Sequence, residues 1–158
     1  MSNLLWNLLL ALAWMAMQGE FSAANFLVGF ALGFLVLFFA RRAVGSPSYV
    51  RKVWQVVSLF LFFVWELIKA NLRVAYDVLT PGYRMRPGLI AVPLDARTDM
   101  EITLLANLIT LTPGTLSLDV SSDRRVLYIH SMYIDADLET ERNKIKHGFE
   151  RRVLEVLR

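Results

Sequence analysis

Cysteine is absent from this chain of 158 residues, and histidine occurs only twice. Without cysteine the chain has no disulfide, no thiolate nucleophile and no cysteine-ligated metal cluster. His130 has no second histidine or paired carboxylate at the spacing of metal ligands, and His147 lies among the bases Lys144, Lys146 and Arg151. The sequence therefore predicts no metal site and no cofactor.

Catalytic signatures are missing as well. No serine lies in a G-x-S-x-G setting, and no P-loop or dinucleotide-binding glycine pattern occurs. We therefore expect no catalytic residue, and we expect that the chain is not an enzyme.

Charge is nearly missing from the first 65 residues, which hold one acid, Glu20, and four bases. The remaining residues hold thirteen charges of each sign, so the net charge of +3 comes from the bases Arg41, Arg42, Arg51 and Lys52. A balanced polar half without a basic stripe does not indicate a nucleic-acid partner. The basic cluster instead indicates how the chain is oriented in a membrane.

Apolar residues make up 56% of the chain, and they gather in three runs at 4–17, 21–40 and 53–65. The second run has 20 residues without a charge, which matches a hydrocarbon core of about 30 Å at about 1.5 Å per helical residue. Because the first run leads directly into the second, a retained anchor is a better interpretation than a cleaved signal. The lipid bilayer is therefore the first predicted partner.

Small residues in the second run are spaced as in a helix-packing seam. Asn25, Gly29 and Gly33 are spaced by four and share one helix face. Small side chains allow two helix backbones to approach closely, and asparagine can hydrogen-bond across the contact. The spacing predicts a partner helix on this face.

The third run changes character after residue 65. Glu66, Lys69, Arg73 and Asp77 follow at i, i+3, i+7 and i+11, which places them in one polar stripe of a helix over 53–79. Glu66 and Lys69 are interpreted first as interfacial anchors. They are also weak candidates for an ion path, because ionisable groups inside a bilayer are usually functional.

The positions of the basic residues are compatible with two or three membrane crossings. The cluster at 41–52 favours the cytoplasm, and so do the bases that follow the third run: Lys69, Arg73, Arg84 and Arg86. Either the third run lies along or only dips into the membrane, or it crosses and the basic loop lies outside. We favour a multi-pass protein of the bacterial inner membrane whose soluble domain is cytoplasmic.

Residues 81–158 predict a small α+β domain of order β-α-β-β-α, after a membrane region at 1–80. The strands are expected at 89–94, 115–120 and 126–134, and a helix at 98–110 carries a Thr98–Glu101 capping box. The last helix begins at Asp135 or Asp137. The fold class is therefore two to three apolar membrane helices plus this α+β domain, which is small for independent stability.

The turn between the helix at 98–110 and the next strand is unusual in composition. Its candidate docking residues are Asn107, Thr110, Thr112, Pro113, Gly114 and Thr115. Ordinary helix-to-strand turn chemistry is the first interpretation of these residues. A docking surface for a partner protein is the second.

Several stretches together resemble the E subunit of Mrp-type multisubunit monovalent cation/proton antiporters. They are NFLVG from Asn25 with Gly33, ELIKAN from Glu66 with Val74, RPG from Arg86 with Ile90, and NLITLTPGT from Asn107. The resemblance covers essentially the whole chain and is most specific over the last of these stretches.

The resemblance implies an accessory subunit that supports assembly and Na⁺ or K⁺/H⁺ transport together with other membrane subunits, without chemistry of its own. It defines no functional residue that transfers to this chain. Two alternatives stay open at this point. One is the equivalent subunit of an energy-converting hydrogenase-type complex, and the other is a stand-alone membrane-tethered binding module.

Overall fold

The computed structural model describes residues 3–40, 47–81, 85–134 and 137–158. Arg41, Arg42, Arg84 and Asp135, which enter the predictions above, lie outside the described residues. The described contacts divide the chain into two compact units, Met1–Trp54 and Gln55–Arg158. Most of the third apolar run therefore groups with the α+β domain. The functional boundary after residue 80 stays a prediction.

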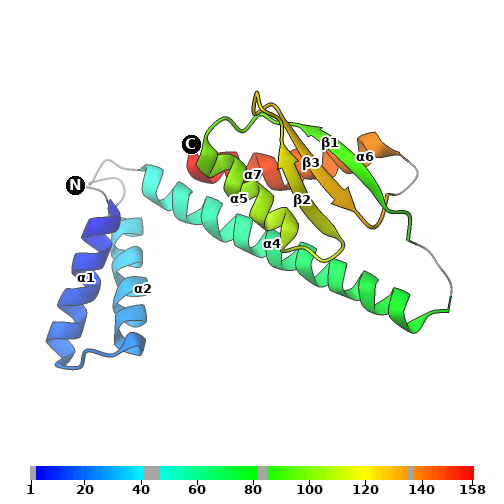
Figure 1. The fold of residues 1–158 in the computed structure, drawn as a ribbon. Coiled ribbons are helices and arrows are strands. Elements are labelled where there is room, and N and C mark those ends of the chain that lie inside the picture. Colours follow the sequence, from blue (N-terminus) through cyan, green and yellow to red (C-terminus); the bar gives the residue numbers. More distant parts are fainter. Residues whose placement is uncertain (1–2, 41–46, 82–84, 135–136) are drawn as a thin grey trace. The chain divides into compact units, whose positions relative to one another are not determined.

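The first unit contains two helices that lie side by side, α1 (Asn3–Gln18) and α2 (Ala23–Phe39) (Figure 1). Gly19 ends the first helix with a φ of 71°, a conformation that glycine adopts without a steric penalty. Ser22 caps the second helix, because its hydroxyl accepts a hydrogen bond from the Asn25 N–H at 3.2 Å. Neither helix contains a charged residue.

The third apolar run and the polar stripe form one helix, α4 (Pro47–Leu79), of 33 residues. The prediction of a single long helix is confirmed, with an earlier start than residue 53. Within the described residues, its segment Val50–Leu79 is the one helix that is long and apolar enough to cross a membrane, judged by length and composition. The helices α1 and α2 are apolar but shorter.

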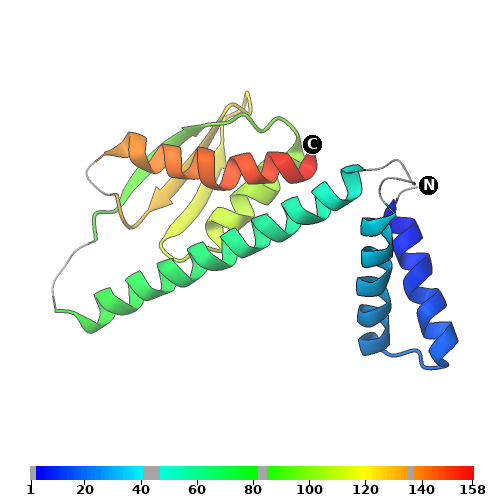
Figure 2. The same cartoon turned by 180° about the vertical axis from the view of Figure 1, so that it is seen from behind.

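The C-terminal part has the predicted β-α-β-β-α order. It consists of β1 (Gly88–Pro93), α5 (Asp99–Thr110), β2 (Thr115–Val120), β3 (Val126–Ser131), and a last helix built from α6 (Leu138–Lys144), η1 (Ile145–Glu150) and α7 (Arg151–Leu157). The antiparallel sheet has the order β1-β3-β2, so the last strand is central. Figure 2 shows α6, η1 and α7 as one continuous helix.

The core lies between one face of the sheet and the two helices α5 and η1. Its members are Ile90, Val92, Leu105, Ile109, Leu127, Ile129 and Ile145. Alternate residues of β1 and β3 supply four of these side chains, since successive strand residues point to opposite faces. The alternation predicted for β3 is confirmed, whereas the regular alternation expected over 115–120 is interrupted by a register shift between Ser117 and Asp119. The π-helical turn η1 was not predicted, because the extra residue of a π-helical turn leaves no periodic pattern in the sequence.

Asp137 caps the last helix, because its carboxylate accepts a hydrogen bond from the Glu139 N–H. The predicted capping box of α5 is also present. The Thr98 hydroxyl accepts from the Glu101 N–H at 3.2 Å, and Glu101 Oε2 accepts from the Thr98 N–H at 3.1 Å.

Glu101 makes two further bonds that strengthen this end of the domain. It accepts a hydrogen bond from the Arg97 N–H at 2.7 Å, and its Oε1 lies 2.9 Å from Arg158 Nε. The Arg158 guanidinium and the two backbone N–H groups of Arg97 and Thr98 lower the pKa of Glu101 from 4.5 to about 2. The ionised carboxylate is therefore the form that the folded domain favours.

This pKa predicts how Glu101→Gln changes the pH dependence of stability. A pKa that is lower in the folded state contributes stability above the ordinary value of 4.5, and the contribution is lost as the pH falls toward about 2. We expect the wild type to melt at a higher temperature than Glu101→Gln at pH 7, and the difference to shrink steadily between pH 4.5 and pH 2. Circular dichroism melting curves in detergent measure this, and a constant difference across that range contradicts the assignment.

Candidate functional site

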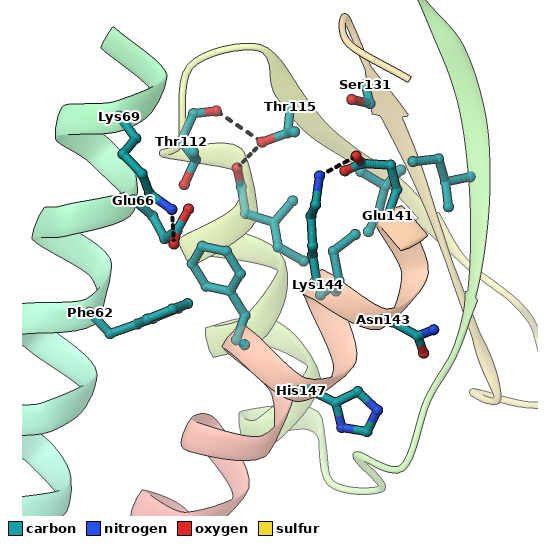
Figure 3. Close-up of a pocket in the computed structure, with 16 residues that line it drawn as sticks. Phe62, Glu66, Lys69, Thr112, Thr115, Ser131, Glu141, Asn143, Lys144 and His147 are labelled. Atoms are coloured by element: carbon teal, nitrogen blue, oxygen red, sulfur yellow. Dashed lines mark hydrogen bonds and ion pairs between the residues drawn. The ribbon is translucent and has the colours of Figure 1, made fainter. Parts of the chain in front are cut away.

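The polar stripe of α4 faces the α+β domain (Figure 3). Glu66 and Lys69 point toward the turn that holds Thr112 and Thr115. They form an ion pair with each other, with Lys69 Nζ 2.6 Å from Glu66 Oε1. The Glu66–Lys69 pair is therefore neutralised within the chain, and both side chains point toward the domain.

Phe62, one turn before Glu66, forms an apolar contact between α4 and the last helix. Its ring meets the Phe149 ring edge-on, with the two centroids 5.1 Å apart. The guanidinium carbon of Arg152 lies 4.0 Å from the Phe62 ring centroid, in cation–π geometry. A Cβ added to Gly148 would lie 3.1 Å from Phe62 Cζ. The absence of a side chain at Gly148 thus permits this close approach.

Arg152 also stabilises the π-helical turn that carries Gly148. Its Nη1 donates a hydrogen bond to the Gly148 carbonyl at 2.9 Å. π-helical turns are uncommon and often occur at functional sites. The position of η1 therefore indicates that the contact between the last helix and α4 is a functional part of the domain.

Tyr133 contacts the C-terminal end of the polar stripe of α4. The guanidinium carbon of Arg73 lies 5.1 Å from the Tyr133 ring centroid. A hydrogen bond to Asp77 raises the pKa of Tyr133 above 10.0. The domain therefore covers α4 from Phe62 to Asp77.

A cavity of about 410 Å³ lies between α4, the sheet and the last helix. Its floor is apolar and includes Phe62, Ile109 and Ile129. Its rim carries the Glu66–Lys69 pair and a second pair, Lys144 Nζ and Glu141 Oε1, at 2.6 Å. Two sets of residues that the sequence analysis singled out separately, Glu66 with Lys69 and the threonine-rich turn, thus meet at one cavity.

Hydrogen bonds within the turn satisfy most of its hydroxyl groups. The Thr115 hydroxyl contacts the carbonyls of Ile109 and Thr112 at 2.6 and 2.9 Å, and the Thr112 hydroxyl donates to the Leu108 carbonyl. The Thr110 hydroxyl accepts from the Ser117 N–H at 3.1 Å. These contacts are those of a helix-to-strand turn.

The other candidate docking residues lie around this turn. Gly114 has a φ of 87°, and a Cβ added there would lie 3.1 Å from the Tyr133 ring. Pro113 is half-buried beside it, and Asn107 is exposed on α5. A docking role for the turn stays a proposal.

The three seam residues of α2 have different surroundings. Gly29 and Gly33 contact α1, because a Cβ at Gly29 would lie 2.9 Å from Trp14 Cβ and one at Gly33 would overlap Asn7 Oδ1. Asn25 lies at the start of α2, where its amide donates to the Glu20 carbonyl at 3.2 Å and to the Glu20 carboxylate at 3.3 Å. The helix that packs against Gly29 and Gly33 is thus α1 of the same chain.

Sequence reasoning missed Gly148 and Arg152, the residues of the last helix that contact Phe62, and the Glu141–Lys144 pair that lines the cavity. One signal was available. A glycine in a helix interior is unfavourable by about 1 kcal/mol relative to alanine, so Gly148 between Ile145 and Val153 indicated a close approach. Within the described residues, no group of three or more His, Cys, Asp or Glu side chains is arranged to hold a metal ion.

Replacing Gly148 with leucine is expected to loosen α4 from the domain, because the new side chain occupies the place of the Phe62 ring. Amide hydrogen exchange within Phe62–Asp77 measures the effect, and we expect it to rise at least tenfold. His147→Leu is the matched control, since His147 is the neighbour on the same turn and has a side chain already. Equal exchange in the two variants contradicts the role of Gly148.

Known proteins match this chain along nearly its whole length. A family model described as "Na+/H+ ion antiporter subunit" matches residues 7–156. The E subunit of the Na(+)/H(+) antiporter of Alkalihalophilus pseudofirmus is 41% identical over 98% of this chain and 97% of its own length.

Two solved structures are also similar. A chain in the structure of the Mrp complex from Dietzia sp. DQ12-45-1b is 29% identical, over 65% of this chain and 96% of that chain, with a TM-score of 0.49. A chain of the membrane-bound sulfane sulfur reductase, an archaeal respiratory membrane complex, is 25% identical over 96% of both chains, with a TM-score of 0.56. With the family model matching nearly its whole length, this chain belongs to the family of Na⁺/H⁺ antiporter E subunits, membrane components of a multisubunit transporter rather than enzymes.

Proposed function

We propose that this subunit supports the assembly and activity of its monovalent cation/proton antiporter complex and carries no ion path of its own. The observation that carries the proposal is the absence of any charged side chain from α1 and α2. Ionisable side chains within membrane helices mark proton and cation paths. The ionisable pair nearest to an apolar helix segment, Glu66 and Lys69, is self-neutralised and turned toward the domain.

A deletion strain complemented with variants of this chain tests the proposal. We expect the deletion to cause sensitivity to salt and alkaline pH, and a native gel to show incomplete assembly of the antiporter. An assembled complex without transport in the deletion strain contradicts a role in assembly.

The same strain tests the two weak candidates for an ion path. We expect Glu66→Gln and Lys69→Met each to retain transport within about twofold of the wild type, because a partly exposed ion pair contributes only about 0–1 kcal/mol. Growth in salt and proton flux in vesicles measure this. A loss of transport with normal assembly in either variant places an ion path at this pair.

The α+β domain is proposed to lie in the cytoplasm, with α1 and α2 inserted in the bacterial inner membrane as a hairpin. The support is the distribution of bases near both ends of α4, where Arg51 and Lys52 lie at one end and Arg86 follows the other. Both groups favour the cytoplasmic side.

The lack of native cysteine allows a direct test of this orientation. Asp119→Cys, exposed on β2, should react with a membrane-impermeant maleimide only in inside-out vesicles. Glu20→Cys, in the turn between α1 and α2, should react only in right-side-out vesicles. Labelling of both positions from one side contradicts the arrangement.

The likeness to the sulfane sulfur reductase chain supports one second candidate, an equivalent role in a respiratory membrane complex. The two assignments differ in the proteins that accompany the subunit. Purification of the intact complex in mild detergent should recover antiporter subunits, whereas iron–sulfur proteins among them favour the respiratory assignment.

A further inference from the structure

The side of α4 that faces away from the domain is a continuous apolar stripe. Its members are exposed large side chains at helical spacings of three and four: Trp54, Val57, Leu61, Trp65, Ile68, Leu72, Tyr76 and Leu79. Trp65 is 59% exposed, Leu72 65% and Leu79 83%. A stripe that runs from residue 54 to residue 79 extends about 38 Å at about 1.5 Å per residue, which is far more than the scattered apolar residues of a soluble surface.

The opposite side of the same helix is covered by a charged domain. Contacts run from Phe62, beneath Arg152, to Asp77, beside Tyr133. Charged side chains of the cavity rim, including Glu141 and Lys144, lie alongside this part of α4. Because such groups are costly in hydrocarbon, Phe62–Asp77 stays outside the hydrocarbon core while the domain is docked.

What remains of the apolar segment is too short to cross. The part from Val50 to Leu61 measures about 18 Å at about 1.5 Å per residue, whereas the hydrocarbon core is about 30 Å thick. Length and composition of α4 by themselves admit a crossing, but the docked domain removes more than half of the available length.

We propose that α4 lies in the plane of the membrane, with its apolar stripe immersed in the lipid interface and the α+β domain held on the aqueous side. A helix with one apolar face and one polar face adopts this position about 5–10 Å into the headgroup region. The two tryptophans and the tyrosine of the stripe have rings that prefer this depth. The proposal rests on membership of a membrane complex and is independent of which side the domain occupies.

The lipid interface fits the stripe better than a groove on another subunit does. The stripe runs along most of α4 without an acid, a base or an amide among its members. Docking grooves between proteins carry polar groups at their rims, and here the Glu66–Lys69 pair beside the stripe is already paired within the chain. The occupant is therefore lipid along the whole stripe.

Site-directed spin labelling of the full-length chain tests the proposal, because the chain has no native cysteine. Single cysteines at each position from 60 to 76 are labelled and reconstituted in phosphatidylethanolamine–phosphatidylglycerol vesicles. Collision with oxygen reports lipid, and collision with a water-soluble nickel chelate reports water. We expect oxygen accessibility to oscillate with a period of about 3.6 residues, with maxima at 61, 65, 68, 72 and 76.

A crossing helix gives a different profile. Its depth increases steadily to the bilayer centre and then decreases, with lipid exposure on all faces over about 18 residues or more. That result overturns the proposal, whatever the deletion strain shows about assembly and transport.

A second measurement in the assembled complex separates lipid from protein as the occupant. A photo-reactive benzoyl-phenylalanine at Leu72, on the stripe, is expected to form adducts with lipid. Its matched control at Asn71, an exposed position next to it on α4, is expected to give markedly fewer lipid adducts. A cross-link from position 72 to another subunit in the majority of complexes overturns lipid as the occupant.

Discussion

Replacing Gly33 with leucine is expected to separate α1 from α2 and to remove most of this subunit from the membrane complex. A Cβ at position 33 would already overlap Asn7 Oδ1 and would lie 3.1 Å from Leu10 Cβ. A leucine adds three more carbons to the same place. Overpacking of a close contact destabilises by about 1–3 kcal/mol and sometimes more, and association of membrane helices depends on such small-residue contacts.

Ala31→Leu is the matched control for this substitution. Ala31 lies two residues earlier on the same helix and is exposed, so the added bulk meets no part of α1 in the described structure. We expect the amount of subunit that co-purifies with the complex to fall at least fivefold for Gly33→Leu and to stay near the wild-type amount for Ala31→Leu. Equal recovery of the two variants contradicts the seam.

Replacing Glu150 with alanine is expected to be the most destabilising change in the α+β domain. This carboxylate is 1% exposed, and its Oε1 accepts hydrogen bonds from the Asp95 N–H at 2.6 Å and the Ala96 N–H at 2.9 Å. Its Oε2 lies 3.2 Å from Lys146 Nζ. The substitution leaves two backbone donors without their acceptor, and each buried donor left unsatisfied costs about 1–3 kcal/mol. Lys146 keeps a second carboxylate partner, with Asp95 Oδ2 at 2.8 Å, so its charge stays paired.

Glu155→Ala serves as the control, because Glu155 lies further along the last helix and is 48% exposed beside Arg151. For the full-length chain in detergent, we expect Glu150→Ala to lower the melting temperature by about 10 °C or more and Glu155→Ala to leave it nearly unchanged. Amide exchange at Asp95 and Ala96 gives the local measure. Retained protection there in Glu150→Ala contradicts the assigned bonds.

The sequence was informative about elements whose pattern repeats locally. The alternation from Val126 to Ser131 predicted the central strand, and the Thr98–Glu101 pair predicted the capping box that the structure contains. The polar stripe that begins at Glu66 predicted a long helix with two unlike faces. In each case, a residue and its near neighbours along the chain determine the outcome.

The sequence was less informative about what covers each face. A stripe of Glu66, Lys69 and Asp77 shows that its surroundings are polar, but water and a protein surface both meet that requirement. Gly148 and Arg152, which contact α4, come from the other end of the chain. Their partnership with Phe62 depends on the folded sheet and on the π-helical turn, neither of which leaves a periodic trace near residue 62.

The position of these partners along the chain also fixes an order of events during synthesis. Phe62 is translated 86 residues before Gly148, which corresponds to a delay of about 4–17 s at about 5–20 residues per second. Throughout this interval the residues of the last helix that contact α4 have not yet been made. Synthesis of the apolar side of α4 is therefore complete before the domain can fold against its charged stripe.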